Sequence, residues 1–417
     1  MAQALRDESR HLMNTYKRPA QIFVRGRGCY LYDQKGRAHL DFLGGIAVNA
    51  LGYAHPRIVR VIRRESARAI HVSNLFHNPY QGPLARKLAE WSGMDRAFFT
   101  NSGTEAVDGA LKLARLAAHT KYGGGKTRFL ALENSFHGRT FGALSITHAA
   151  KYRDPFAPLV PGVEFVRFND VADLESKFDE TVCAIVLEPI QGEGGIYPVS
   201  PAFWQKSREL ATRFGAALIA DEIQCGLGRT GRPFAYQRLP GLPDIVVLAK
   251  PIGGGLPLGS FLASEEFASA FSPGLHGSTF GGGPLLCAVG LEFLATVEEE
   301  GLLENIRARG AQLREGFARL ARKFDFIREV RGEGLILVLD LRVEGGPYVA
   351  EAMRRGLLIN CTHDHVLRFL PPYILSARQA DDGLAILEAV LAETARPQEV
   401  AMPAGGEAPR LEMAAAR

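Results

Sequence analysis

The sequence has few cysteines, no long apolar run and no large excess of charge of either sign. Only five of its 417 residues are cysteines, and none forms a C-x-x-C pair, which fits a reduced protein. No run approaches the ~18 apolar residues of a membrane span, and the first residues lack the apolar core of a signal peptide. The net charge of +4 is too small to indicate a nucleic-acid partner. We therefore expect a cytoplasmic protein that binds neither membranes nor nucleic acids.

Complete nucleotide-binding and metal-binding motifs are also lacking. Residues 122–127 read "YGGGKT" and end like a P-loop, but Thr120 stands where that motif requires its first glycine. No G-x-G-x-x-G follows an expected strand, so a dinucleotide site is not expected. His363, Asp364 and His365 have the composition of a metal site. Such clusters also arise by chance, and we expect no metal.

Short apolar segments alternate with amphipathic segments between residues 51 and 300. Their continuous hydrophobicity is typical of strands buried on both faces, so this part is predicted to be a large α/β domain with a mostly parallel sheet. Residues 1–50, with a helix and a β-hairpin or meander, are assigned to a smaller domain. Residues 301–396 begin with a long amphipathic helix and are expected to form its C-terminal α+β part. Residues 397–417 lack a core pattern and are predicted to be a disordered tail.

Polar side chains follow several of the expected strands. "AIVLEPIQGEGG" ends in Glu188 and Glu193, "AALIADEIQ" in Asp221, Glu222 and Gln224, and "DIVVLAK" in Lys250. Each of them could be a structural cap or a surface charge. Ligands of such sheets bind beyond the carboxyl ends of the strands, so the joint occurrence of these groups favours a site at one sheet edge.

The segment "TNSGTEA" lies at an expected strand-to-helix junction. Ser102 and Thr104 are good helix-capping residues, and Gly103 allows close approach to the backbone. Free amides at a helix start suit a phosphate group, although a plain capping box would have the same pattern.

A phosphate site, an acidic group and a lysine at a strand end together suit pyridoxal phosphate. That cofactor needs a lysine for a Schiff base, an aspartate for its pyridinium nitrogen and a phosphate cradle. Lys250 is followed by Pro251 and by three glycines, so a rigid strand end would hold the lysine while the loop lets it move. Apolar surroundings would lower its pKa and make it a usable nucleophile and base.

The sequence resembles the class III, ornithine-type aminotransferases of fold type I from about residue 17 to 395. The resemblance is carried by the blocks "NSGTEA", "SFHGRT", "EPIQGEGG", "ADEIQCGLGRTG", "AKPIGGGLPLG", "HGSTFGG" and "VLRFLPP" in this order. It implies a large domain with a mostly parallel sheet, a smaller C-terminal α+β domain and pyridoxal 5'-phosphate as the cofactor.

The resemblance also implies roles toward the cofactor. Lys250 is similar to the Schiff-base lysine, and Asp221 to the aspartate beside the pyridine nitrogen. The remaining cofactor contacts implied are Gly103 and Thr104 at the phosphate, Phe136 stacked on the ring, Glu222 and Ile223 next to Asp221, and Gln224 near the ring hydroxyl. Thr279, in "HGSTF", resembles a threonine that reaches the phosphate from a second subunit, which implies a homodimer with shared active sites.

The substrate-binding residues implied are Arg139, Ser278, Glu193 and Arg368. Arg139 resembles the arginine that binds the substrate α-carboxylate. Arg368 resembles the arginine that binds the carboxylate of 2-oxoglutarate, and Glu193 the glutamate that pairs with it and swings away. Alternatively, Glu193 merely caps a turn.

Within the family, "DFLGGIAVNALGYAHP" is most similar to acetylornithine aminotransferases. The implied reaction moves the ω-amino group of N2-acetyl-L-ornithine to 2-oxoglutarate, a step of arginine biosynthesis. Succinylornithine, ornithine, 4-aminobutyrate or a carrier-bound lysine precursor are alternative donors. A pyridoxal-dependent aminomutase and a catalytically silent regulator are rival classes, but Arg139, Gln224 and Lys250 argue against them.

Overall fold

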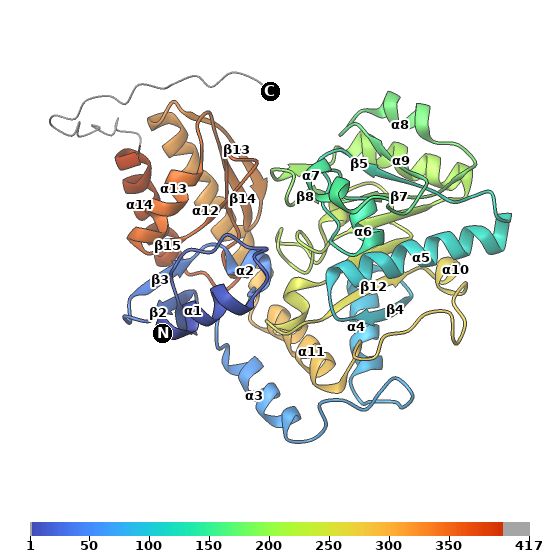
Figure 1. The fold of residues 1–417 in the computed structure, drawn as a ribbon, viewed down its shortest axis with the longest axis horizontal. Coiled ribbons are helices and arrows are strands. Elements are labelled where there is room, and N and C mark those ends of the chain that lie inside the picture. Colours follow the sequence, from blue (N-terminus) through green and yellow to red (C-terminus); the bar gives the residue numbers. More distant parts are fainter. Residues whose placement is uncertain (1, 395–417) are drawn as a thin grey trace, which may run out of the picture.

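Seven strands form the central sheet of the chain, whose residues 2–394 are described by the computed structural model (Figure 1). The strand order is β4-β12-β11-β10-β7-β5-β6. These strands are β4 (Arg96–Thr100), β5 (Arg128–Leu132), β6 (Val163–Val166), β7 (Val182–Leu187), β10 (Ala217–Asp221), β11 (Ile245–Leu248) and β12 (Gly259–Ala263). The pairs from β11 to β6 are parallel, whereas β12 is antiparallel to both β11 and β4. The prediction of a mostly parallel sheet is confirmed.

Helices cover both faces of this sheet (Figure 1). Successive residues of a strand point to opposite faces, so Ile219 of β10 packs in one apolar cluster with Val107 of α5 (Gly103–Tyr122). Leu218 packs in another cluster with Phe203 of α9 (Pro201–Phe214). The other helices of this part are α3 (Pro56–Ser66), α4 (Gln81–Ser92), α6 (Phe141–Ser145), α7 (Ala150–Arg153), α8 (Val171–Lys177), α10 (Glu265–Ala268) and α11 (Pro284–Glu299).

The N-terminal and C-terminal segments lie side by side next to this part (Figure 1). The antiparallel strands β1 (Phe23–Arg27), β2 (Tyr30–Asp33) and β3 (Ala38–Asp41) form one sheet with β15 (Leu357–Leu358), which is parallel to β3. This pairing joins the first segment of the chain to the last. The domain boundaries expected near residues 50, 300 and 396 stay predictions, and the expected tail, 397–417, lies outside the described residues.

A four-stranded antiparallel sheet forms most of the C-terminal part. Its order is β13 (Ile327–Glu333), β14 (Ile336–Leu341), β17 (Val366–Phe369) and β16 (Asn360–Thr362). On one face, Phe369 packs against Phe317 of α12 (Leu302–Lys323), with 4.6 Å between ring centroids. On the other face, Val338 and Val366 share an apolar cluster with Ile190 from the central part. Arg368 alternates with Phe369 along β17, so it lies on the face that meets the central part.

The remaining elements connect these layers. They are α1 (Ala2–His11), α2 (Gly44–Ala47), α13 (Gly346–Arg355), α14 (Ala377–Thr394), the two-stranded β8 (Ile190–Gln191) and β9 (Tyr197–Pro198), and the short 3-10 turns η1 (Asp154–Phe156), η2 (Ala235–Arg238) and η3 (Lys250–Gly253). Every residue of α2 has a positive φ, which makes it a left-handed turn.

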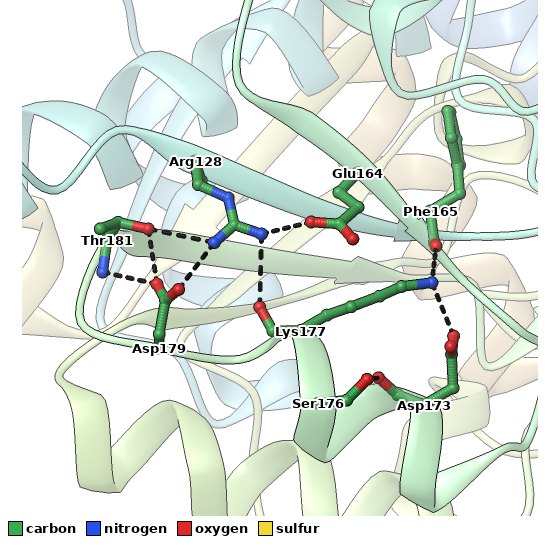
Figure 2. Close-up of polar contacts among 8 residues, drawn as sticks. All are labelled: Arg128, Glu164, Phe165, Asp173, Ser176, Lys177, Asp179 and Thr181. Carbon is green, nitrogen blue, oxygen red and sulfur yellow. Dashed lines mark hydrogen bonds and ion pairs between the residues drawn. The ribbon is translucent and has the colours of Figure 1, made fainter.

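Charged side chains link the amino end of β5 to β6 and to the segment that follows α8 (Figure 2). Arg128 contacts the carboxylate of Glu164 on β6 and donates to Asp179 Oδ2 at 2.9 Å. Lys177, at the end of α8, donates to Asp173 Oδ2 at 2.9 Å. The network lies at the amino end of the strand, and the polar groups singled out in the sequence lie at the opposite edge of the sheet.

Candidate active site

A cavity of about 520 Å³ lies at the carboxyl edge of the central sheet. Its walls come from the β4–α5 junction, the loop after β5 and the ends of β7, β10 and β11. The predicted site residues that line it are Gly103, Thr104, Phe136, Arg139, Asp221, Ile223, Gln224 and Lys250. Predicted residues from four separate stretches of sequence therefore meet in one place, as expected for the edge of a parallel sheet.

Lys250 lies just beyond β11, at the first residue of η3, rather than on the strand itself. Its φ is +50°, a left-handed conformation that costs a non-glycine residue about 1 kcal/mol or more. Burial lowers the pKa of the Lys250 amine, and the nearby Glu193 carboxylate only partly opposes this. The cavity thus contains an amine that loses its proton more readily than an ordinary lysine.

Asp221 ends β10 and is buried beside the cavity. Its Oδ1 accepts a hydrogen bond from the Ile223 amide at 3.0 Å, and its Oδ2 lies 2.7 Å from His137 Nδ1. Burial lowers the pKa of His137, but the hydrogen bond and charge of Asp221 outweigh it and raise that pKa overall. The carboxylate is therefore fixed in orientation, beside a histidine whose charged form it favours.

The start of α5 forms the anion-binding end of the cavity. Ser102 caps the helix, with its Oγ accepting from the Glu105 amide at 3.3 Å. Glu105 Oε2 accepts from the Asn101 amide at 2.6 Å, one residue before Ser102, so the motif is a cap without the return bond of a capping box. The amides of Gly103 and Thr104 open the helix and have no intrahelical acceptor. A Cβ at Gly103 would lie 2.8 Å from Ile223 Cδ1, so the helix start packs closely against the strand end. These free amides suit a phosphate group.

Arg368 and Glu193 form an ion pair beside the cavity. Arg368 is fully buried, and its Nη1 lies 2.5 Å from Glu193 Oε1. Gln224 joins both, since its Oε1 accepts from Arg368 Nη1 at 2.9 Å and its Nε2 donates to Glu193 at 3.1 Å. Burial raises the pKa of Glu193, but the charges of Arg368 and Lys250 outweigh it and lower that pKa overall. The pair brings together two residues predicted to act on the same substrate.

Two neighbouring loops are tied to this arrangement by Glu188 at the end of β7. Its Oε1 accepts from the Phe136 amide at 2.9 Å and its Oε2 from the Gly192 amide at 2.8 Å. Burial raises the pKa of Glu188 to about 7. A single carboxyl group thus positions both the loop that carries Phe136 and the loop that carries Glu193.

Arg139 and Thr104 are linked through the loop after β5. Thr104 Oγ1 accepts from the Arg139 amide at 3.1 Å and from the Thr140 amide at 3.0 Å. The Arg139 guanidinium lies 3.8 Å from the ring centroid of Tyr152. The exposed Arg139 side chain is therefore supported by an aromatic face at the cavity wall.

Five predicted residues do not line this cavity within the chain. Arg368 and Glu193 lie beside it as an ion pair. The Glu222 carboxylate accepts from the amides of Ala235 and Tyr236, at 3.0 and 2.7 Å, and holds that loop instead. Ser278 and Thr279 line a separate surface hollow of about 1040 Å³. Ser278 still approaches the first cavity, because Asn101, which lines it, donates to Ser278 Oγ at 3.3 Å.

No local sequence pattern predicts the part played by His137. Its partner Asp221 lies 84 residues away, and His137 has no local pattern beyond its place in "SFHGRT". Within residues 2–394, no cluster of histidine, cysteine or acidic residues could hold a metal ion. His363 and Asp364 instead form a left-handed turn, with φ of 48° and 59°. No helix in the described part of the chain combines the length and apolarity that a membrane span requires.

The cavity fits pyridoxal 5'-phosphate. Its volume lies within the range of about 300–1,000 Å³ that is usual for cofactor sites. It combines an amine with a lowered pKa, a buried carboxylate and free helix-start amides, the three groups which that cofactor needs.

Comparisons with known proteins agree with this chemistry. The chain is 44% identical over 387 residues to an acetylornithine aminotransferase of Caldanaerobacter subterraneus subsp. tengcongensis, covering 93% of this chain and 98% of that protein. An acetylornithine aminotransferase of Aquifex aeolicus is 44% identical over 383 residues, 91% of this chain and 100% of that protein. The crystal structure of the ornithine aminotransferase of Toxoplasma gondii superposes with a TM-score of 0.90 at 31% identity, covering 94% and 95% of the two chains.

A crystal structure of the acetylornithine aminotransferase of Elizabethkingia anophelis superposes with a TM-score of 0.84 at 30% identity, covering 94% of this chain and 99% of that one. These likenesses confirm the predicted fold type I architecture. The aminotransferase class-III family matches residues 13–391. The protein therefore belongs to the class-III aminotransferases, which are pyridoxal 5'-phosphate enzymes.

Proposed function

We propose that this protein transfers the ω-amino group of N2-acetyl-L-ornithine to 2-oxoglutarate, giving N-acetylglutamate 5-semialdehyde and glutamate. Relatives named acetylornithine aminotransferase, at 41–45% identity over nearly the whole chain, support this donor. The observation that carries the proposal is the Arg368–Glu193 pair beside Lys250. Such a pair lets one site accept both an ω-amine and a keto acid whose carboxylate lies next to the reacting carbon. The reaction would serve arginine biosynthesis.

Pyridoxal 5'-phosphate supplies, when bound, an electron-withdrawing ring next to the substrate carbon that loses a proton. In this proposal Lys250 holds the cofactor and then moves that proton with its Nζ, which a lowered pKa favours. Asp221, oriented by His137, pairs with the pyridine nitrogen. Gly103 and Thr104 hold the phosphate, and the remaining wall residues Phe136, Ile223 and Gln224 surround the ring.

Arg139 and Arg368 are proposed to bind different carboxylate groups of the two substrates. Arg139 lies at the exposed side of the cavity and would bind the α-carboxylate of the donor. Arg368 would bind the carboxylate next to the keto group of 2-oxoglutarate. During the donor half-reaction no such carboxylate is present, and Glu193 neutralises Arg368 so that the cationic donor amine is not repelled.

A homodimer with shared active sites is also part of the proposal. Thr279 lies on the surface of the chain, in a hollow next to the exposed apolar side chains of Leu75, Phe76 and Phe280. Exposed apolar groups gathered around a hollow are typical of an interface. A second copy seated there would bring Ser278 and Thr279 to the phosphate end of its neighbour's cavity. The five cysteines are free, which fits a reducing cytoplasmic compartment.

Single-turnover measurements with a set of donors test the function. N-acetylornithine should give a higher second-order rate constant for the donor half-reaction than ornithine, succinylornithine or 4-aminobutyrate. Addition of 2-oxoglutarate should then restore the starting spectrum with release of glutamate. A clear preference for another donor would replace the proposed substrate while leaving the reaction class unchanged.

A further inference from the structure

Asn360 lies beside Arg368 on the C-terminal sheet, on the face that meets the central part of the chain. The two residues are direct partners in the antiparallel pairing of β16 with β17, so their side chains project from the same face. Asn360 Oδ1 accepts a hydrogen bond from Arg368 Nε at 3.2 Å. This contact links Asn360 to the arginine that the proposed function assigns to 2-oxoglutarate.

The nitrogens of Arg368 are used unequally. Nη1 donates to Gly192 O at 2.9 Å and also contacts Gln224 and Glu193. Nε donates to Asn360. Among residues 2–394, Nη2 has no hydrogen-bond acceptor. A guanidinium binds a carboxylate through two parallel hydrogen bonds, from either its Nε–Nη2 edge or its Nη1–Nη2 edge. Asn360 occupies the first of these edges and Glu193 the second.

We propose that Asn360 is a positioning residue that restricts an incoming carboxylate to the Nη1–Nη2 edge of Arg368. The inference rests on the proposed function, in which Arg368 binds the carboxylate of the keto acid. Nη1 donates to Glu193, Gly192 O and Gln224, so a carboxylate can bind through both Nη1 and Nη2 only when Glu193 leaves and one of the other two acceptors gives up its hydrogen bond. Asn360 thereby makes occupation by Glu193 and by the keto acid mutually exclusive.

Asn360 also holds the arginine after Glu193 has left. A neutral amide oxygen satisfies Nε without neutralising the guanidinium, so the full charge stays available to the substrate. During the donor half-reaction the Glu193 ion pair holds Arg368 as well, and Asn360 matters less. During the acceptor half-reaction Glu193 no longer contributes, so the loss of Asn360 should mainly weaken the binding of 2-oxoglutarate.

The test compares half-reactions of the full-length holoenzyme. Asn360→Ala should raise the KM for 2-oxoglutarate and the Kd for glutarate, a dicarboxylate without the keto group, by about tenfold, as for a lost hydrogen bond to a charged group. The kcat at saturating 2-oxoglutarate and the half-reaction with N-acetylornithine should stay within about twofold. Asn360→Asp, which keeps the shape but adds a competing carboxylate, should weaken glutarate binding more than Asn360→Ala. Thr362→Ala is the matched control, because Thr362 lies on the same strand and its hydroxyl has no partner among the described residues.

A double-mutant cycle separates positioning from a merely structural role. Glu193→Ala should tighten glutarate binding strongly in the wild-type background and less in Asn360→Ala, because the Arg368 that glutarate then binds is no longer held at its Nε. Additive effects, or equal losses in both half-reactions for Asn360→Ala, would overturn the inference. If Arg368→Ala loses glutarate binding while both Asn360 variants behave like Thr362→Ala, the inference about Asn360 is refuted and the proposed function of Arg368 stands. If Arg368→Ala binds glutarate normally, the proposed function of Arg368 fails together with it.

Discussion

Removing the carboxylate of Glu193 should change the two half-reactions in opposite directions. In Glu193→Ala the buried Arg368 loses the carboxylate with which it pairs, and its charge lies uncompensated next to the Lys250 cavity. That charge should repel the ammonium group of N-acetylornithine and slow the donor half-reaction. It should attract the carboxylate of 2-oxoglutarate or glutamate, which no longer has to displace Glu193. The variant should therefore favour one substrate at the expense of the other.

The size of the effect follows from how far each partner is buried. The Arg368 side chain is 1% exposed and that of Glu193 33% exposed. Breaking a fully buried pair costs about 3–5 kcal/mol, whereas an exposed pair contributes about 1 kcal/mol or less. Gln224 and the Gly192 carbonyl still accept from Nη1 in the variant and soften the loss. We expect about 1–2 kcal/mol, which corresponds to a change of roughly 5- to 30-fold in each half-reaction.

Rapid-mixing spectra of each half-reaction measure both directions separately. Arg368→Ala should show the reverse pattern, with the glutamate side impaired and the N-acetylornithine side spared. Glu351→Ala is a suitable control, since Glu351 pairs with Arg354 and Arg355 on α13, away from the cavity, and should change neither half-reaction. Equal losses on both sides for both site variants would refute the reasoning and leave two generic binding residues.

Three further predictions concern the ring nitrogen, a buried carboxyl group and the subunit interface. Asp221→Asn should bind the cofactor but lose about 3 kcal/mol of transition-state stabilisation, roughly a 150-fold lower kcat, and near-normal turnover would contradict this. Burial raises the pKa of Glu222 to about 7, so above pH 4.5 the folded protein keeps a proton that the unfolded chain has lost, and stability falls as the pH rises toward 7. In urea unfolding of the apoprotein, the free energy of unfolding of the unsubstituted protein should fall between about pH 5 and 7.5 by about 2 kcal/mol more than that of Glu222→Gln. Parallel pH curves for the two proteins would exclude the raised pKa. Light scattering at assay concentration should show a dimer, and Thr279→Ala should weaken cofactor binding about tenfold, whereas an active monomer would overturn shared sites.

Local patterns were enough to find the wall of the cavity but not its inner contacts. Asp221 stands out because it ends an apolar strand and Lys250 because it lies just beyond one, and parallel strands bring such positions to one edge. The contact between Asp221 and His137 joins positions 84 residues apart, so no local pattern could reveal it. Glu222 follows Asp221 directly, and only the backbone turn after β10 shows that its carboxylate points to the 235–236 amides instead of the cavity.

Strand direction and register likewise could not be predicted from the sequence. The apolar run of β12 resembles its neighbours, and nothing in its composition indicates that it runs antiparallel to β11 and β4. Asn360 meets Arg368 only because β16 pairs with β17 in one register, and a shift by one residue would turn its side chain to the other face. Such relations depend on tertiary packing, which hydrophobic periodicity does not encode.

Lys250 is the residue proposed to hold the cofactor, and every other role at the site depends on it. Reducing the pyridoxal-loaded protein with borohydride fixes the cofactor on its lysine, and digestion followed by mass spectrometry then identifies the modified peptide. The modification should lie on Lys250, and Lys250→Ala should keep its fold and bind the cofactor without turnover or trapping. Modification of another lysine, or turnover that survives in Lys250→Ala, would contradict the account.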